Sequence, residues 1–219
     1  ESVVVAPSLT LPENAYQKLR TSALKVVKSL GIVGGCNVQF AYNSKTQDYI
    51  LIEVNPRVSR SSALASKATG VPIARIAAML CLGHRIHELP NRVTGNTSAA
   101  FEPSIDYVIT KIPRWPFDKF KLADRELGTQ MKSTGETMSI GRTFEESLMK
   151  AWRSIGQGEG FPECLDWSEE RLKKNLKVPN DRRLHVIWTY LKNHNATQKS
   201  VDKVCNITDF HAFFIQRIA

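Results

Sequence analysis

The period of the hydrophobic pattern changes near residue 35, and this change restricts the fold more than any other feature of the chain. Residues 13–30 follow a helical period, with Pro12 at the start and Gly31 at the end. One face of this predicted helix carries the apolar residues Ala15, Leu19, Ala23, Val26, Val27 and Leu30. From there the pattern alternates with a period of two, over Cys36–Tyr42 and again over Tyr49–Asn55. The polar stretch 43–48 between them predicts a β-hairpin.

The two predicted strands each divide their side chains between two faces. On the first, Val38, Phe40 and Tyr42 are expected on one face and Asn37, Gln39 and Ala41 on the other. On the second, Ile50, Ile52 and Val54 are expected on one face and Leu51, Glu53 and Asn55 on the other. Each strand therefore has one face that carries polar side chains.

The rest of the chain predicts an α+β fold, a mostly antiparallel sheet with helices that is followed by an all-α segment. Helices are expected over 61–69 and 72–82, with Gly70 and Gly83 as their stops, and a strand over 105–112 that ends at Pro113. Residues 84–98 are expected to form a polar loop, and Thr143 with Glu146 marks the start of another helix. Helices without strands are expected at 168–177, 183–193 and 208–218. Three glycines near residue 158 suggest two domains, 1–157 and 158–219.

Composition excludes several functional classes. The chain has 219 residues, of which 42% are hydrophobic and 23% charged, as is usual for globular proteins. Its net charge is +9, but 156–219 hold ten Lys/Arg and eight Asp/Glu, a net of +2, so the other +7 is scattered over 1–155. The basic residues do not alternate with aromatic ones, which argues against nucleic-acid binding. No apolar run has the length of a membrane helix, and four widely spaced cysteines predict reduced thiols in a cytoplasmic protein.

The polar faces of the two strands carry a candidate metal site. Gln39 on the first strand and Glu53 and Asn55 on the second would come together in a hairpin. Their oxygens are ligands that Mg²⁺ prefers when phosphates complete its coordination. Arg57 and Arg60 follow, and a guanidinium there could hold an anionic acceptor or the transferring phosphoryl group. Spacing alone leaves open a solvated polar face.

Longer motifs resemble a known family. Glu53-x-Asn55-x-Arg57 is similar to the ATP-grasp pattern, in which a carboxylate and an amide bind the Mg²⁺ of the nucleotide. Around it, the segments 34–40, 53–70, 101–107, 111–115 and 131–136 resemble the large subunit of carbamoyl-phosphate synthase, in order and without large gaps. The resemblance is strong over 1–155 and weaker over 156–219. The run Ser61–Lys67 resembles the first of the two ATP-grasp halves of that subunit, so the fold expected is the C-terminal part of this half followed by an incomplete helical oligomerisation domain.

The resemblance also implies roles for the candidate residues. Gln39 and Glu53 would contact Mg²⁺ (or Mn²⁺) and the phosphates of ATP, and Asn55 would complete the metal set. Arg57 would face bicarbonate or carboxyphosphate, and Arg60 is a weaker candidate for the same anion. K⁺ is a further candidate cation. The implied reaction is the ATP-dependent phosphorylation of bicarbonate, on the way to carbamoyl phosphate for arginine, urea or pyrimidine synthesis.

The implied partners are a glutaminase, as a small subunit or a fused domain, the second ATP-grasp half of the same chain, and further copies bound through the helical tail. The location implied is cytoplasmic, or mitochondrial in a eukaryotic parent. Since the chain begins within a strand-like stretch, we expect a fragment that does not turn over ATP by itself, because the upstream part of the nucleotide site does not fit before residue 12. Two alternatives stay open: another ATP-grasp carboxylate–amine ligase or biotin-carboxylase-like enzyme, and a non-catalytic assembly module.

Overall fold

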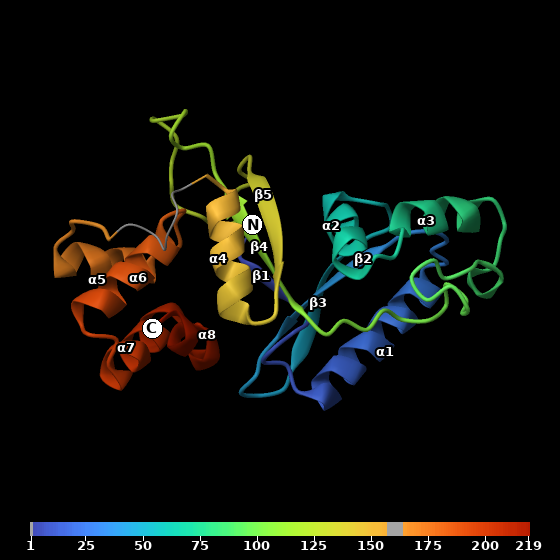
Figure 1. Cartoon of the computed structure of the whole chain (residues 1–219), viewed down its shortest axis with the longest axis horizontal. Coiled ribbons are helices and arrows are strands. Elements are labelled where there is room, and N and C mark those ends of the chain that lie inside the picture. Colours follow the sequence, from blue (N-terminus) through green and yellow to red (C-terminus); the bar gives the residue numbers. More distant parts are fainter. Residues whose placement is uncertain (1, 157–163) are drawn as a thin grey trace. The chain divides into compact units, whose positions relative to one another are not determined.

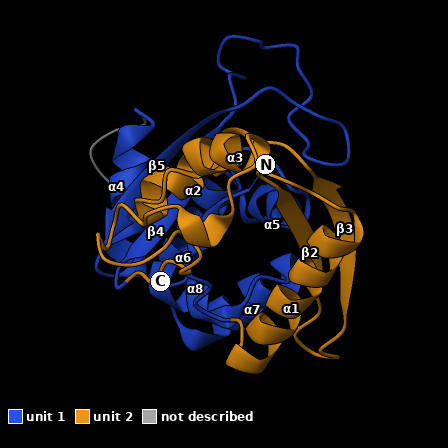
Figure 2. Cartoon of the chain, turned by 90° about the vertical axis from the view of Figure 1, so that its right-hand side faces the viewer, with its two compact units in different colours: residues 1–10, 106–219 blue, residues 11–105 orange. Residues whose placement is uncertain are grey.

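The computed structural model describes residues 2–156 and 164–219. These residues form two compact units, one made of residues 11–105 and the other of 1–10 with 106–219 (Figure 2). The predicted boundary near residue 158 falls in a stretch outside the described residues, so the division into 1–157 and 158–219 stays a prediction. Each unit is described by itself.

The unit of residues 11–105 contains the predicted hairpin and three helices (Figure 1). In chain order its elements are α1 (Glu13–Ser29), β2 (Asn37–Tyr42), β3 (Tyr49–Asn55), α2 (Arg60–Thr69), α3 (Ile73–Cys81) and the short 3-10 helix η1 (Ile86–Glu88). Helix α2 ends at Gly70, which takes the left-handed conformation with φ of 76°. The predicted helices and strands of this unit are therefore confirmed to within two residues, and the predicted loop 84–98 differs only in containing η1.

The hairpin contains a β-bulge that the alternating pattern does not predict. Gln39 lies opposite Glu53, but the next residue, Phe40, lies opposite Leu51, so Ile52 has no partner on β2. The predicted faces of β3 are therefore wrong beyond the bulge. Leu51 shares the face of Phe40, and Ile50, which lies opposite Ala41, shares the face of Glu53.

Helix α1 contacts the apolar face of this hairpin through Tyr49. The hydroxyl groups of Tyr49 and Ser22 are hydrogen-bonded at 2.7 Å, and the ammonium of Lys18 lies 5.1 Å from the centre of the Tyr49 ring. The rings of Tyr49 and Phe40 meet edge to face at 5.8 Å. The opposite face of the hairpin, which carries the polar side chains, is thus the one away from these contacts.

The other unit is built on a three-stranded antiparallel sheet in the order β1 (Val4–Ala6), β4 (Val108–Arg114), β5 (Gly135–Gly141). The prediction for β4 is wrong at both ends, since the strand begins at Val108 and continues through Pro113. Proline has no amide hydrogen to donate to a neighbouring strand. It is tolerated at position 113 because β1 pairs only with Ile109–Lys111 and so ends before Pro113. Strand β5 was not expected, because its sequence Gly-Glu-Thr-Met-Ser-Ile-Gly has few β-branched apolar residues.

Helix α4 (Phe144–Ser154) packs closely against this sheet. Its N-cap is Thr143, whose hydroxyl oxygen accepts a hydrogen bond from the amide of Glu146, as the sequence predicts. The fully buried hydroxyl groups of Thr110 on β4 and Ser147 on α4 are hydrogen-bonded at 2.6 Å. A glycine is required at 141, because a Cβ atom there would lie 2.6 Å from the amide nitrogen of Ser147.

The remaining helices complete the core of this unit. They are α5 (Glu169–Lys177), α6 (Arg183–Asn193), α7 (Gln198–Thr208) and α8 (Ala212–Ile218). The predicted helix 208–218 is wrong at its start, because Asp209 takes a left-handed conformation that ends α7 and Ala212 begins α8. Helix α7 was not predicted, and its buried stripe is short and mixed with polar residues. One hydrophobic cluster joins Trp152 and Leu148 of α4 to Leu176, Tyr190 and Val204 of the tail.

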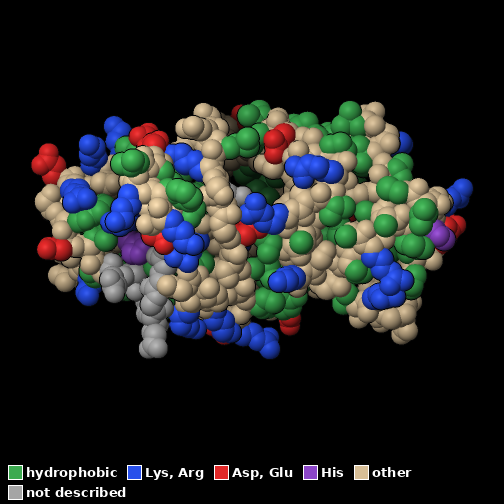
Figure 3. All heavy atoms as spheres, turned by 90° about the horizontal axis from the view of Figure 1, so that it is seen from above, with side chains coloured by type: hydrophobic (Ala, Val, Ile, Leu, Met, Phe, Trp, Pro, Cys, Tyr) green, Lys and Arg blue, Asp and Glu red, His purple; other side chains and the backbone are tan. Residues whose placement is uncertain are grey.

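In the part of the chain that the structure describes, no single helix is long and apolar enough to cross a membrane; only α2 and α3 taken together, with a bend of 115° between them, pass a test of length and composition. All four cysteines are free. On the face drawn in Figure 3, Lys and Arg side chains are interspersed with hydrophobic and acidic ones.

Candidate functional site

The predicted metal ligands lie on one face of the hairpin, at the end from which β3 continues toward α2. Gln39 lies directly opposite Glu53, and Asn37 lies directly opposite Asn55. Residues that face each other across two strands, or that lie two positions apart on one strand, point to the same side of the sheet. The hairpin therefore brings together all three predicted ligands and adds Asn37, which the sequence analysis did not select although it lies on the same face as Gln39.

Hydrogen bonds join these side chains into a cluster around one carboxylate oxygen. Oε1 of Glu53 accepts a hydrogen bond from Nε2 of Gln39 at 2.7 Å and another from Nδ2 of Asn55 at 3.0 Å. The same Nε2 of Gln39 donates to Oδ1 of Asn37 at 3.2 Å. Gln39 and Glu53 are exposed, whereas Asn37 and Asn55 are half-buried. The cluster is therefore accessible to a ligand, with the second carboxylate oxygen of Glu53 not used in these bonds.

The two predicted arginines lie in the segment that follows β3. Arg57 occupies a bend, in which its amide donates a hydrogen bond to the carbonyl oxygen of Asn55 at 2.8 Å, and its side chain is exposed. Arg60 is the first residue of α2 and is also exposed. The amide of the N-cap residue, Ser59, donates to Oγ of Ser62 at 3.1 Å, which fixes the start of α2. Both arginines therefore follow Asn55 within five residues in the sequence, in the exposed connection from β3 into α2.

The chemistry of the cluster suits a hard cation. Among residues 2–156 and 164–219, no group of three His, Cys, Asp or Glu side chains could hold a metal ion. The cluster has a single carboxylate and offers amide oxygens beside it, which is a set that Mg²⁺ can use when phosphate oxygens and water supply the other ligands. The residues present therefore fit a Mg²⁺ ion that arrives with a polyphosphate.

An ion pair fastens α1 to the last part of the same unit. Nε of Arg20 donates to both carboxylate oxygens of Glu102, at 2.7 and 2.9 Å. These hydrogen bonds hold the pKa of Glu102 below its usual value. Because the side chains of Arg20 and Glu102 are 39% and 57% exposed, the pair should add little to the free energy of unfolding.

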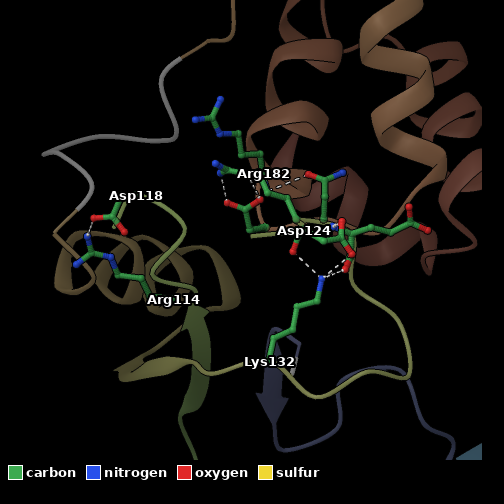
Figure 4. A network of polar contacts seen from close by, with 9 residues as sticks. Arg114, Asp118, Asp124, Lys132 and Arg182 are labelled. Carbon is green, nitrogen blue, oxygen red and sulfur yellow. Dashed lines mark hydrogen bonds and ion pairs between the residues drawn. The ribbon is translucent and has the colours of Figure 1, made fainter. Parts of the chain in front are cut away.

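A second polar cluster, in the unit with the helical tail, involves the connection between β4 and β5 (Figure 4). The ammonium of Lys132 donates to the carbonyl oxygens of Asp124 and Glu126 and to Oδ2 of Asp124. Glu126 also forms an isolated β-bridge with Asn180. The pKa of Asp124 is lowered, chiefly because the amide of Glu126 donates to its carboxylate and then because Lys132 does. Since these groups satisfy one another, the cluster fixes the connection onto the tail.

Comparison with a solved structure defines the class of fold. The crystal structure of a biotin carboxylase–β,γ-ATP complex from Campylobacter jejuni is similar to this chain, with a TM-score of 0.51 and 11% identity. The matched region covers 93% of this chain and 44% of the biotin carboxylase chain. At this identity the likeness concerns the fold alone. The α+β architecture, with antiparallel sheets, is that of the ATP-grasp domains of such enzymes, as the sequence analysis expected.

Comparison with known sequences defines the family. Residues 1–89 match the family described as carbamoyl-phosphate synthase L chain, ATP binding domain, and residues 136–219 match the carbamoyl-phosphate synthetase large chain, oligomerisation domain. The whole chain is 53% identical to the carbamoyl phosphate synthase large chain, N-terminal section, of Methanopyrus kandleri and 52% identical to the large chain of Methanothermobacter thermautotrophicus. This chain therefore belongs to the carbamoyl-phosphate synthase large-chain family. It spans 39% of the length of the first relative and 20% of the second.

Proposed function

We propose that the chain supplies the metal-holding part of an ATP site that phosphorylates bicarbonate to carboxyphosphate, as part of a carbamoyl-phosphate synthase. The observation that carries this proposal is the cluster of Gln39, Glu53 and Asn55 on the exposed face of the hairpin, in a chain of this family. The match to an N-terminal section along the whole chain supports assignment to the first of two ATP-grasp halves.

In the proposed reaction, an oxygen of bicarbonate attacks the γ-phosphorus of ATP. The bond from that phosphorus to the β,γ-bridging oxygen breaks, and ADP leaves with the electron pair. Such a transfer needs positioning and charge neutralisation rather than a protein nucleophile. Ammonia that a glutaminase releases from glutamine would then give carbamate, and a second ATP-grasp half would phosphorylate it to carbamoyl phosphate.

Each candidate residue has a role that follows from its chemistry. Glu53, Gln39 and Asn55 would hold Mg²⁺ (or Mn²⁺), which when bound neutralises the charge on the transferring phosphoryl group. For Gln39 to offer its oxygen, its carboxamide has to turn, because its nitrogen now faces Glu53. The guanidinium of Arg57 would hold bicarbonate and then carboxyphosphate by paired hydrogen bonds, with Arg60 as a second donor. K⁺ stays a prediction that the same assays can test.

The test is bicarbonate-dependent ATP hydrolysis by the full-length protein, with and without Glu53→Gln, which keeps the shape of the side chain but removes its charge. We expect a loss of at least roughly a hundredfold, since one well-placed electrostatic contact contributes about that much to a rate. Lys67→Gln, on an exposed position of α2 outside the cluster, is the control variant. Full activity of the Glu53→Gln protein would contradict the assignment, and measurable turnover by the 219-residue chain alone would contradict our proposal that this chain by itself is inactive.

The same assay separates the proposed reaction from other ATP-grasp chemistry. A carbamoyl-phosphate synthase should form carbamoyl phosphate when ammonia or glutamine is added with bicarbonate and ATP. A biotin-carboxylase-like enzyme should instead require biotin as the acceptor, and another carboxylate–amine ligase should require a different carboxylate. Sequence identity of 53% to a carbamoyl phosphate synthase, against 11% to a biotin carboxylase, favours the first.

Assembly is a second candidate function, favoured by the match of residues 136–219 to an oligomerisation domain. We propose self-association through the helical tail, together with a glutaminase, separate or fused, and the second ATP-grasp half as the other partners. Sedimentation equilibrium of the chain over a range of concentrations tests self-association against the monomer mass of 24.6 kDa. A truncation at residue 158 would not be a fair test, because the core joins Trp152 and Leu148 to the tail. A monomer at every concentration would argue against the assembly role.

A further inference from the structure

One residue of the hairpin has no counterpart on the opposite strand. Between the pair Gln39–Glu53 and the pair Phe40–Leu51, β3 contains one residue more than β2, and this residue is Ile52. An extra residue of this kind forms a β-bulge, which interrupts the ladder of hydrogen bonds, bends the strand and increases its twist. The bulge is directly adjacent to the pair of residues at the centre of the polar cluster.

The packing of the hairpin does not account for this extra residue. The side chain of Ile52 is 58% exposed, so it adds little to the apolar core. Without Ile52, the pairs Phe40–Leu51 and Gln39–Glu53 would follow each other in a regular ladder. All the remaining residues of the two strands would keep their present faces. The bulge is therefore not needed to put polar and apolar side chains on the correct sides.

What the bulge changes is the direction of the backbone at Glu53. Oε1 of Glu53 lies within hydrogen-bonding distance of two amides, one on each strand, at 2.7 and 3.0 Å. A local bend next to Glu53 can re-aim its side chain, and bulges are frequent beside functional sites for this reason.

We propose that the backbone of Ile52 is a positioning element for the cation site. The bulge turns Glu53 so that one carboxylate oxygen is held by the amide of Asn55, and by that of Gln39 until its carboxamide turns toward the cation, while the other oxygen is left for the cation. This inference rests on the proposed function of the cluster, and the side chain of Ile52 is not part of it. Any residue that keeps the bulge should therefore serve at position 52.

The test measures binding of Mn²⁺ with β,γ-imido-ATP to the full-length protein by electron paramagnetic resonance. Deletion of Ile52 removes the bulge, whereas Ile52→Ala removes most of the side chain but keeps the extra backbone unit. We expect the dissociation constant of Mn²⁺ to rise at least tenfold on deletion and to stay within threefold for Ile52→Ala. Ile50→Ala is the matched control, since Ile50 is exposed to a similar extent, 66% against 58% for Ile52, and lies in a regularly paired position.

Each outcome decides the matter. A deletion variant that melts at the same temperature and binds Mn²⁺ as tightly as the parent would overturn the proposal, as would an Ile52→Ala variant that loses as much affinity as the deletion. Should the deletion variant not fold, a second variant without Ile52 but with an alanine inserted between Ile50 and Leu51 keeps the length and moves the bulge; unchanged affinity there would also overturn it. Unchanged Mn²⁺ binding by Glu53→Gln would instead refute the cation site itself.

Discussion

The contact between β5 and α4 allows a sharp test of the packing in the unit that carries the helical tail. In Gly141→Ala, the new methyl group would lie 2.6 Å from the amide nitrogen of Ser147 and 3.1 Å from the carbonyl carbon of Glu146. Ordinary contacts of this kind begin at 3.4 Å, so the overlap with the nitrogen is 3.4 − 2.6 = 0.8 Å. Both atoms belong to the backbone of α4, and no side-chain rotation can relieve the clash.

The cost follows from what has to move. The amide of Ser147 donates to the carbonyl oxygen of Thr143 in the first turn of α4, and its hydroxyl is hydrogen-bonded to Thr110 in the sheet. Moving α4 outwards would strain the hydrogen bond to Thr110, and a local shift of Ser147 alone would strain the one to Thr143. We therefore place the loss near the upper end of the usual range for overpacking, at about 3 kcal/mol. At roughly 4 °C for each kcal/mol in a unit of this size, the melting temperature should fall by about 12 °C.

Differential scanning calorimetry of the chain measures this change, with Gly128→Ala as the matched control. A Cβ atom at Gly128 would meet nothing within 4 Å, so that variant should stay within about 1 kcal/mol of the parent, and the lower entropy of its unfolded state could even stabilise it. Equal melting temperatures for the two variants would refute the close approach of α4 to β5.

Three further predictions concern stability and local structure. Thr110→Val should cost about 1–2 kcal/mol, because it removes the buried hydrogen bond to Ser147, and the double variant with Ser147→Ala should cost less than the sum of the single changes in denaturant titrations. Lys132→Gln should increase the rate of chymotrypsin cleavage at the exposed Phe120 or Met131 roughly several-fold, since it weakens the contacts that hold the β4–β5 connection; an unchanged rate would show that Lys132 does not fix it. The pKa of Glu146 lies below its usual value of 4.5 because first Lys150 and then the amide of Arg142 donate to it. The stabilising effect of the ionised Glu146 side chain is therefore complete above its pKa in the unfolded chain, and it is lost as the pH falls through its lower pKa in the folded chain. Glu146→Gln should accordingly reduce the difference between the melting temperatures at pH 7 and pH 3.

Periodicity predicts those elements whose sequence agrees with their environment. Helix α1 and both strands of the hairpin have strong periods and clear stops, and they lie within two residues of their predicted bounds. Strand β5 and helix α7 were missed for the same physical reason: Ser139 and Ser200 occupy buried positions where a pattern analysis expects apolar residues. Their burial depends on neighbours distant in sequence, which local pattern does not contain.

The candidate site was predictable to a similar extent. Alternation indicates that Glu53 and Asn55 share a face, because both lie on the regular side of the bulge, and pairing in a hairpin then places Gln39 beside them. The same alternation wrongly assigns Ile50 and Leu51, because Ile50, Ile52 and Val54 form a perfect period of two and conceal the extra residue. A bulge leaves no mark in the sequence when the unpaired residue is apolar, like its neighbours.

Charge links the cluster to the chemistry proposed for it. Glu53 is the only carboxylate in the cluster, and its hydrogen-bond partners Gln39 and Asn55 are neutral. One negative charge attracts a divalent cation weakly in an exposed position, where water screens it. A polyphosphate would add several negative charges beside the same ion, so the cation should bind mainly together with the nucleotide. An exposed hairpin with one carboxylate thus suits a site whose other ligands arrive with the substrate. This explains how the chain can carry the proposed cation ligands with no dense acidic cluster among residues 2–156 and 164–219.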